Sequence, residues 1–186
     1  MKREARGICR EGLLCKGSIE LIREEKESDW PEVFTVNQAA FDTPAEANLV
    51  DALREQCRPI ISLVAEEDRT IIGHIMFSPV RLSGHPDVRI MGLAPMAVLP
   101  QYQRKRVGSA LVQSGLEKCR ALGVGAVVVL GHIGYYPRFG FVPSVRYGIG
   151  CEYQVPEEAF MVLELQSGYL AGKTGIIQYH EAFKNL

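Results

Sequence analysis

The stretch LPQYQRKRVGSALV, residues 99–112, marks the passage from a loop into a helix. A strand-like run, MAVLP, ends just inside it, and apolar residues of the following ALVQSGLEKCRAL recur at helical spacing. Three cations, Arg104, Lys105 and Arg106, stand where this helix should begin. A helix N-terminus already carries about half a positive charge, so cations there destabilise the helix unless an anion binds. The stretch therefore predicts an anion site on a strand–loop–helix unit.

The residue types of this loop suit a phosphate group. The first N–H groups of a helix lack intrahelical partners, and together with three cations they favour a bound anion. Gly108 allows a ligand to approach the backbone closely. The patterns GxxxxGK[ST] and GxGxxG are both absent, so neither common nucleotide fingerprint applies. A solvated surface is the alternative, but the position after a buried strand favours a ligand that carries a diphosphate.

The composition is that of an ordinary globular domain. The chain has 186 residues, of which 47% are hydrophobic and 23% are charged, which is enough for one domain with a substantial core. Its net charge of −1 predicts no nucleic-acid partner, so any basic site is local. Contact between the basic loop and RNA is a weaker alternative.

Cysteine usage and hydropathy indicate the compartment. The five cysteines form no CxxC pair, and no histidine stands at a metal-ligand spacing from one, so we expect no disulfide framework, no metal and a reducing cytoplasm. No apolar run reaches membrane-spanning length, so no membrane partner is expected. Residues 1–17 lack the apolar stretch of a signal peptide and are expected to form a loosely ordered leader before a domain at 18–186.

Periodicity and turn signals divide that domain into strands and helices. Strands are predicted at 18–25, 59–67, 70–82, 88–100 and 126–131, with 159–165 as the last, and helices at 28–41, 43–56 and from the cationic loop to about Gly123. A further helix and strand are predicted around YYPRFGF, between 131 and 159. The order β-α-α-β-β-β-α-β-α-β-β predicts a mixed α/β domain. Its crossover unit, residues 89–130, is of the kind that binds ligands beyond the carboxyl ends of its strands.

Several separate stretches resemble one family. Val98-Leu99-Pro100, then Gln103 and Gly108, resemble the V-x-P and [QR]-x-x-G-x-[GA] pattern of the Gcn5-related N-acetyltransferase (GNAT) family. GHIMFSPV (73–80), GLAPMAVLP (92–100), VVVLGHIGYYPRFGF (127–141) and EEAFMVLEL (157–165) are similar to its YhbS-like branch. The resemblance spans residues 18–186 and implies a splayed central mixed β-sheet flanked by helices.

The resemblance also implies the co-substrate, acetyl-CoA. Its diphosphate would bind the backbone of the cationic loop, and its pantetheine arm would pair like an extra strand with β backbone. The implied binding residues are Met96, Ala97, Val98, Gln103, Arg104, Lys105, Arg106, Val107, Gly108 and Ser109. Arg106 replaces the first glycine of the family pattern; we expect helical backbone angles there, with the N–H still directed at the ligand.

Acetyl transfer to an amine needs a proton donor for the departing thiolate. The family's Y-x-x-x-G-F pattern matches Tyr136 to Phe141, and this implies that Tyr136 is the general acid. A tyrosine pKa near 10 against a thiol pKa near 8.5 is compatible with that role. A purely structural aromatic is the alternative for Tyr136. The neighbouring Tyr135 is expected to point elsewhere, and a backbone N–H near Ala97 or Val98 to hold the oxyanion.

The base is less clearly indicated. His132 is the first candidate, because it follows a buried strand just before the tyrosine motif. His74 and Glu66 are alternatives on central strands, although a strand histidine is more often structural. Cys119 falls on the apolar stripe of its helix, so direct transfer is favoured over an acetyl-cysteine intermediate.

The predicted function is transfer of acetyl from acetyl-CoA to a primary amine of a small-molecule or peptide acceptor. The alternative is a catalytically silent acyl-CoA-binding sensor or regulatory module, suggested by Arg106. Segments 28–57 and 83–88 are expected to select the acceptor, either through their acidic residues or with those residues merely solvated. Segment 166–186 is expected to cover the cleft or to form a dimer contact, so a homodimer is among the expected states.

Overall fold

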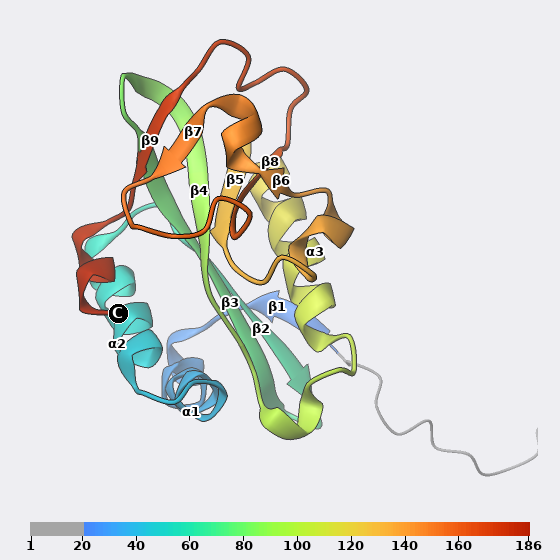
Figure 1. Ribbon diagram of the computed structural model, residues 1–186. Coiled ribbons are helices and arrows are strands. Elements are labelled where there is room, and N and C mark those ends of the chain that lie inside the picture. The colour runs from blue at the N-terminus through green and yellow to red at the C-terminus, as the bar shows by residue number, and fades with distance from the viewer. Residues whose placement is uncertain (1–20) are drawn as a thin grey trace, which may run out of the picture.

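A computed structural model describes residues 21–186 of the chain (Figure 1). The helices and strands are β1 (Leu21–Glu24), α1 (Trp30–Ala40), α2 (Ala45–Gln56), β2 (Ile61–Glu67), β3 (Thr70–Leu82), β4 (His85–Val98), α3 (Val107–Ala121), β5 (Ala126–Leu130), β6 (Val142–Pro143), β7 (Ile149–Cys151), β8 (Phe160–Glu164) and β9 (Gly175–Gln178). Short 3-10 helices are η1 (Glu27–Asp29), η2 (Pro100–Tyr102), η3 (Tyr136–Phe139), η4 (Ser144–Tyr147) and η5 (Glu181–Asn185). The predicted leader, 1–17, and the predicted domain start at 18 lie outside the described residues.

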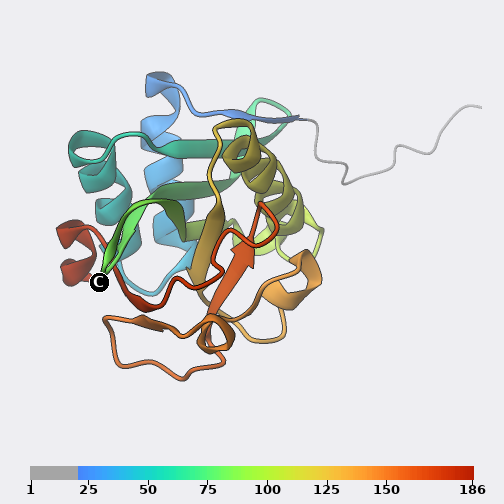
Figure 2. The same cartoon turned by 90° about the horizontal axis from the view of Figure 1, so that it is seen from above.

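One mixed sheet forms the centre of the molecule. Its strand order is β1-β2-β3-β4-β5-β8-β6, antiparallel except for the parallel pair β4 and β5. β9 pairs with the end of β3 and with β7. Helices α1 and α2 cover one face of the sheet and α3 covers the other, as the view from above shows (Figure 2). The mixed α/β fold predicted from the sequence is therefore confirmed.

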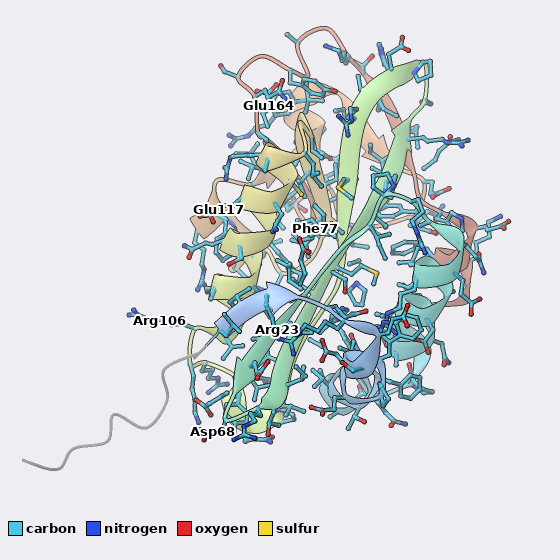
Figure 3. The ribbon with its side chains drawn as sticks, turned by 180° about the vertical axis from the view of Figure 1, so that it is seen from behind. Arg23, Asp68, Phe77, Arg106, Glu117 and Glu164 are labelled. Carbon is cyan, nitrogen blue, oxygen red and sulfur yellow. The ribbon has the colours of Figure 1, made fainter. Side chains whose placement is uncertain are left out.

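The crossover unit forms as its residues predict. The run 126–129 is buried on both faces of the sheet, as its continuous apolar sequence requires. The buried stripe of α3, which includes Leu111, Leu116 and Cys119, packs on the sheet. Phe77 of β3 lies between sheet and helix (Figure 3), so close to Gly115 that a Cβ there would stand 2.2 Å from the ring. Gly123, at φ 70°, ends the helix region where expected.

Two predicted elements are wrong. The helix expected after 131 is only the four-residue η3, because Pro137 starts it and Gly140, at φ 93°, stops it. Strand 159–165 is not the last, since β9 follows it. β9 comes from a glycine-rich segment with little periodicity, and its position depends on tertiary pairing of Gln178 with Arg81.

Strands β4 and β5 separate part-way along their length. In β4, only Ile90, Met91 and Gly92 pair with β5. The residues from Leu93 to Val98 pair with β3 alone. β5 continues instead against β8. Because Pro95 has no N–H and the β3–β4 register shifts between Ile75 and Phe77, the end of β4 bends away from β5. The edge of β4 that faces β5 is thus left without a strand partner.

A buried polar network joins the sheet to α1 and α2. The side chain of His74 has no exposed surface; its Nδ1 lies 3.1 Å from Asn37 Nδ2 and its Nε2 lies 2.9 Å from Ser62 Oγ. Ser62 donates to Glu25, which also pairs with Arg54 at 2.7 Å. Burial alone would raise the pKa of Glu25, but hydrogen bonds from His74, Arg54 and Ser62 lower it to about 2. Burial lowers the pKa of His74.

This network predicts loss of stability in acid. Glu25 stabilises the fold above its ordinary pKa of 4.5, and this stabilisation, about 3 kcal/mol, is lost as pH falls towards 2. The neutral His74 acts in the same direction below pH 6.5. Urea denaturation at a series of pH values is expected to show a steep acid decline that Glu25→Gln flattens, while the exposed Glu117→Gln leaves it intact. An unchanged slope in Glu25→Gln would contradict the assignment.

Candidate active site

The cationic loop leads directly into α3. After η2 the chain turns through Gln103, whose side-chain amide donates to the carbonyl of Val98 at 3.1 Å and ties the loop to the end of β4. Arg106 is the N-cap of α3 and has left-handed backbone angles, φ 69° and ψ 3°. The helical angles expected for Arg106 are therefore wrong: the helix begins one residue later, at Val107. Left-handed angles cost a residue with a side chain about 1–2 kcal/mol, which explains why glycine suits this position.

The start of α3 is open to an anion. The N–H groups of Val107, Gly108 and Ser109 have no intrahelical partner, because they lie in the first turn of the helix. Among the described residues no side chain caps this turn and no acidic residue lies in it. Figure 3 shows Arg106 beside this end of the helix. The helix dipole and exposed cations therefore favour negative charge at one point.

Two cavities meet at this point. The first, of about 530 Å³, is lined by Met96, Val98, Gln103, Arg104, Arg106, Val107, Gly108, Ser109, Tyr135 and Arg138. The second, of about 600 Å³, is lined by Met96, Gln103, Arg104, Gly131, His132, Gly134, Tyr135, Tyr136 and Arg138. Because they share five residues, they form one continuous hollow, which we call the α3 cleft. It runs from the N-terminus of α3 past Met96, on the unpaired part of β4, to Tyr136.

The cleft contains most of the residues that the sequence singles out. Lys105 and Ala97 are not among its lining residues: the Lys105 ammonium stands 5.0 Å above the ring of Tyr102, and the buried Ala97 pairs with His74. Tyr135 lines both cavities, so the expectation that it points elsewhere is wrong. Arg138 also lines both cavities, and sequence reasoning missed it. Its place in the tyrosine motif was the only local signal.

Tyr136 belongs both to the core and to the cleft. It is 7% exposed, and its ring packs edge-on against Tyr135 and Phe141 with centroids 5.1 and 5.7 Å away. Gly131 makes room for it, since a Cβ there would stand 2.3 Å from the ring. Burial raises the pKa of Tyr136 well above its ordinary value, so the hydroxyl stays protonated at neutral pH.

The candidate bases lie in different surroundings. His132 is exposed in the α3 cleft, where its Nδ1 accepts a hydrogen bond from the Gly134 N–H at 3.1 Å. His74 has both ring nitrogens occupied in the buried network, and Glu66 pairs with Arg23 at 2.8 Å. Neither His74 nor Glu66 lines the cleft. Of the three, only His132 lies beside Tyr136.

A larger hollow lies elsewhere. A space of about 1030 Å³ opens beside β1 and the C-terminal ends of α2 and α3, and it shares no lining residue with the α3 cleft. Of its cations, Arg54 pairs with Glu25 and Lys118 with Glu24, while Arg58 donates to backbone carbonyls. Carboxylates outnumber cations on its walls, whereas the α3 cleft is lined by arginines and by no carboxylate.

Three further observations concern metal ligands, membrane helices and Cys119. Within residues 21–186 no group of histidine, cysteine and carboxylate side chains is arranged to hold a metal ion. No helix in the same range is long and apolar enough to cross a membrane. Cys119 has no exposed surface, and burial raises its pKa to about 12, so it is not a nucleophile at neutral pH.

The fold and this cleft define a class of enzyme. A model of the acetyltransferase (GNAT) family matches residues 19–141, and the chain belongs to that family of acetyl-CoA-dependent N-acetyltransferases. It is 38% identical over 164 residues, 88% of its length and 98% of the relative's, to an uncharacterized N-acetyltransferase of Escherichia coli K12, YhbS.

Solved structures agree with this membership. The crystal structure of Escherichia coli YhbS in complex with CoA has a TM-score of 0.84 and 37% identity, covering 88% of this chain and 91% of that one. A GNAT family acetyltransferase from Brucella melitensis, in complex with acetyl-CoA, has a TM-score of 0.73 and 36% identity, covering 88% and 97%.

Proposed function

We propose that this protein transfers the acetyl group of acetyl-CoA directly to a primary amine of a small-molecule or peptide acceptor in the cytoplasm. One observation carries the proposal: a single cleft joins the anion-binding end of α3, an unpaired strand edge and a protonated tyrosine. These are the three things that a diphosphate, an amide-bearing arm and a departing thiolate require.

Each part of the co-substrate has a place in the cleft. The diphosphate would accept from the N–H groups of Val107, Gly108 and Ser109, with Arg104 and Arg106 around it. The pantetheine amides would pair with the backbone of Met96 to Val98, where β4 has lost β5. Relatives of 36–37% identity crystallised with CoA and acetyl-CoA support the choice of co-substrate.

The chemistry proceeds in two stages. The neutral amine attacks the thioester carbonyl, and a backbone N–H near Ala97 or Val98 holds the resulting oxyanion. The carbon–sulfur bond then breaks, and Tyr136 donates its proton to the sulfur as CoA leaves. The ammonium proton passes to a base. His132 is the proposed base. Its Nδ1 accepts from the Gly134 N–H, so the neutral ring carries its proton on Nε2, and Nδ1 takes the ammonium proton after releasing Gly134.

The strained Arg106 supports one alternative. A chain that places arginine at φ 69° where the family pattern has glycine could bind acyl-CoA as a silent sensor. Tyr136 favours the enzyme, because a binding module needs no acid for a thiolate. The assay that decides is release of free CoA thiol with a panel of primary amines, with the acetylated product identified by mass. Acceptor-dependent release is expected; co-substrate binding without release for any amine would favour the sensor.

The state of assembly is part of the proposal. A homodimer is among the expected states, and sedimentation at several protein concentrations tests it. Within segment 166–186, β9 pairs with β3 and β7, and η5 packs on α2. None of these residues is among those that line the α3 cleft, so for this segment we propose the dimer contact.

A further inference from the structure

Arg138, in η3, lines both cavities of the α3 cleft, as Arg104 of the cationic loop does. It is exposed, yet two contacts hold it: its guanidinium carbon lies 4.7 Å above the ring of Tyr135, and Nη2 donates to the carbonyl of Gly134 at 3.1 Å. The guanidinium carries five N–H donors, and only one is used. The side chain is therefore positioned in advance and keeps most of its capacity to bind an anion.

The cleft carries more positive charge than a diphosphate needs. Arg104, Arg106 and Arg138 line it, and in the described part of the chain none of them forms an ion pair with a carboxylate. The N-terminus of α3 adds about half a charge to these three. A diphosphate diester brings only two negative charges. In a chain of net charge −1, this local excess indicates a further anionic group on the ligand.

The position of Arg138 indicates which group. The hydroxyl of Tyr135 lies 2.9 Å from where a Cβ of Gly108 would be, and thus reaches the proposed diphosphate seat, while Arg138 covers the face of the same ring. Arg138 is therefore separated from the proposed diphosphate site by about the width of the Tyr135 ring. In coenzyme A the diphosphate and the 3′-phosphate leave the same ribose and are likewise separated by one sugar ring.

We propose that Arg138, braced on Tyr135, binds the 3′-phosphate of coenzyme A and makes the enzyme select it over dephospho-CoA. The inference rests on the proposed function. A charge-assisted hydrogen bond to phosphate at an exposed site gives about a tenfold preference. Arg104 and Arg106, by contrast, act on the diphosphate that both ligands carry.

The experiment is calorimetric titration of the intact chain with CoA and with dephospho-CoA. The variants are Arg138→Gln, Arg138→Lys and, as matched control, Arg146→Gln, which changes an exposed arginine at the same place in the 3-10 helix η4. The unaltered protein and Arg146→Gln are expected to bind CoA about ten times more tightly. Arg138→Gln is expected to lose this preference by weakening CoA alone, and Arg138→Lys to keep part of it.

The outcomes separate this inference from the proposed function. Equal affinities of the unaltered protein for the two ligands would overturn the role of Arg138 and leave acetyl transfer standing. The same holds if Arg138→Gln keeps the preference, or weakens both ligands alike. If the unaltered protein binds neither ligand, the proposed function fails and the inference fails with it.

Discussion

Tyr136→Phe is expected to lower kcat by about 100-fold or more while the Kd for acetyl-CoA changes less than twofold. The substitution removes only the hydroxyl, and general acid catalysis contributes about 10²–10⁴ to a rate. The ring keeps its edge-on contacts with Tyr135 and Phe141, so thermal stability is expected to hold. Steady-state release of CoA thiol and calorimetric binding measure the two quantities separately.

Tyr135→Phe is the matched control for this prediction. Its hydroxyl lies at the Gly108 end of the cleft, so its loss is expected to weaken acetyl-CoA binding a few-fold and leave kcat nearly unchanged. Tyr136→Phe is thus expected to lower kcat and spare binding, whereas Tyr135→Phe is expected to weaken binding and spare kcat. Unchanged kcat in Tyr136→Phe would remove Tyr136 from the mechanism and restore its interpretation as a core aromatic.

Gly108→Val is expected to weaken acetyl-CoA binding by more than 100-fold. A Cβ at Gly108 already stands 2.9 Å from the Tyr135 hydroxyl and 3.6 Å from the Met96 side chain, and the two methyl groups of valine extend further into the place proposed for the diphosphate. The backbone angles at Gly108 are helical, so they do not exclude a side chain, although the Tyr135 hydroxyl must move to admit one. We therefore expect a large loss in binding and a smaller loss in thermal stability.

Gln113→Val is the control for this substitution. It places the same β-branched side chain on an exposed position of α3, away from the cleft. Calorimetric binding and a thermal unfolding curve for both variants separate a filled cleft from a weakened helix. Unimpaired binding in Gly108→Val would mean that the diphosphate lies elsewhere.

The sequence was sufficient to predict the crossover unit because its signals are local. A continuous apolar run predicts β5, an apolar stripe predicts α3, and cations at the junction predict the anion site between them. The left-handed angles of Arg106 leave no such signal, since a side chain at φ 69° is disfavoured and is imposed by the path of the loop. The sequence therefore predicted the strand–loop–helix junction but not how the loop enters the helix.

Residues brought together by tertiary structure could not be predicted in the same way. Tyr135 and Arg138 reach the cleft through the conformation of η3 and the residues beside it. Pro137, Gly140 and the close packing at Gly131 fix this conformation, and that packing exists only in the folded chain. The buried network of His74 joins strands and helices that lie far apart in the sequence, so the sequence favours a structural role for His74 but leaves a base role open. Because the side chain of His74 is fully buried, its role is structural.

Calorimetric titration of the purified protein with acetyl-CoA, with adenosine as the control, tests whether the N-terminus of α3 and its arginines bind the diphosphate, which adenosine lacks. We expect a Kd in the micromolar range for acetyl-CoA and no measurable binding of adenosine. Failure to bind acetyl-CoA, or equal binding of adenosine, would contradict the claim that the α3 cleft is a diphosphate site.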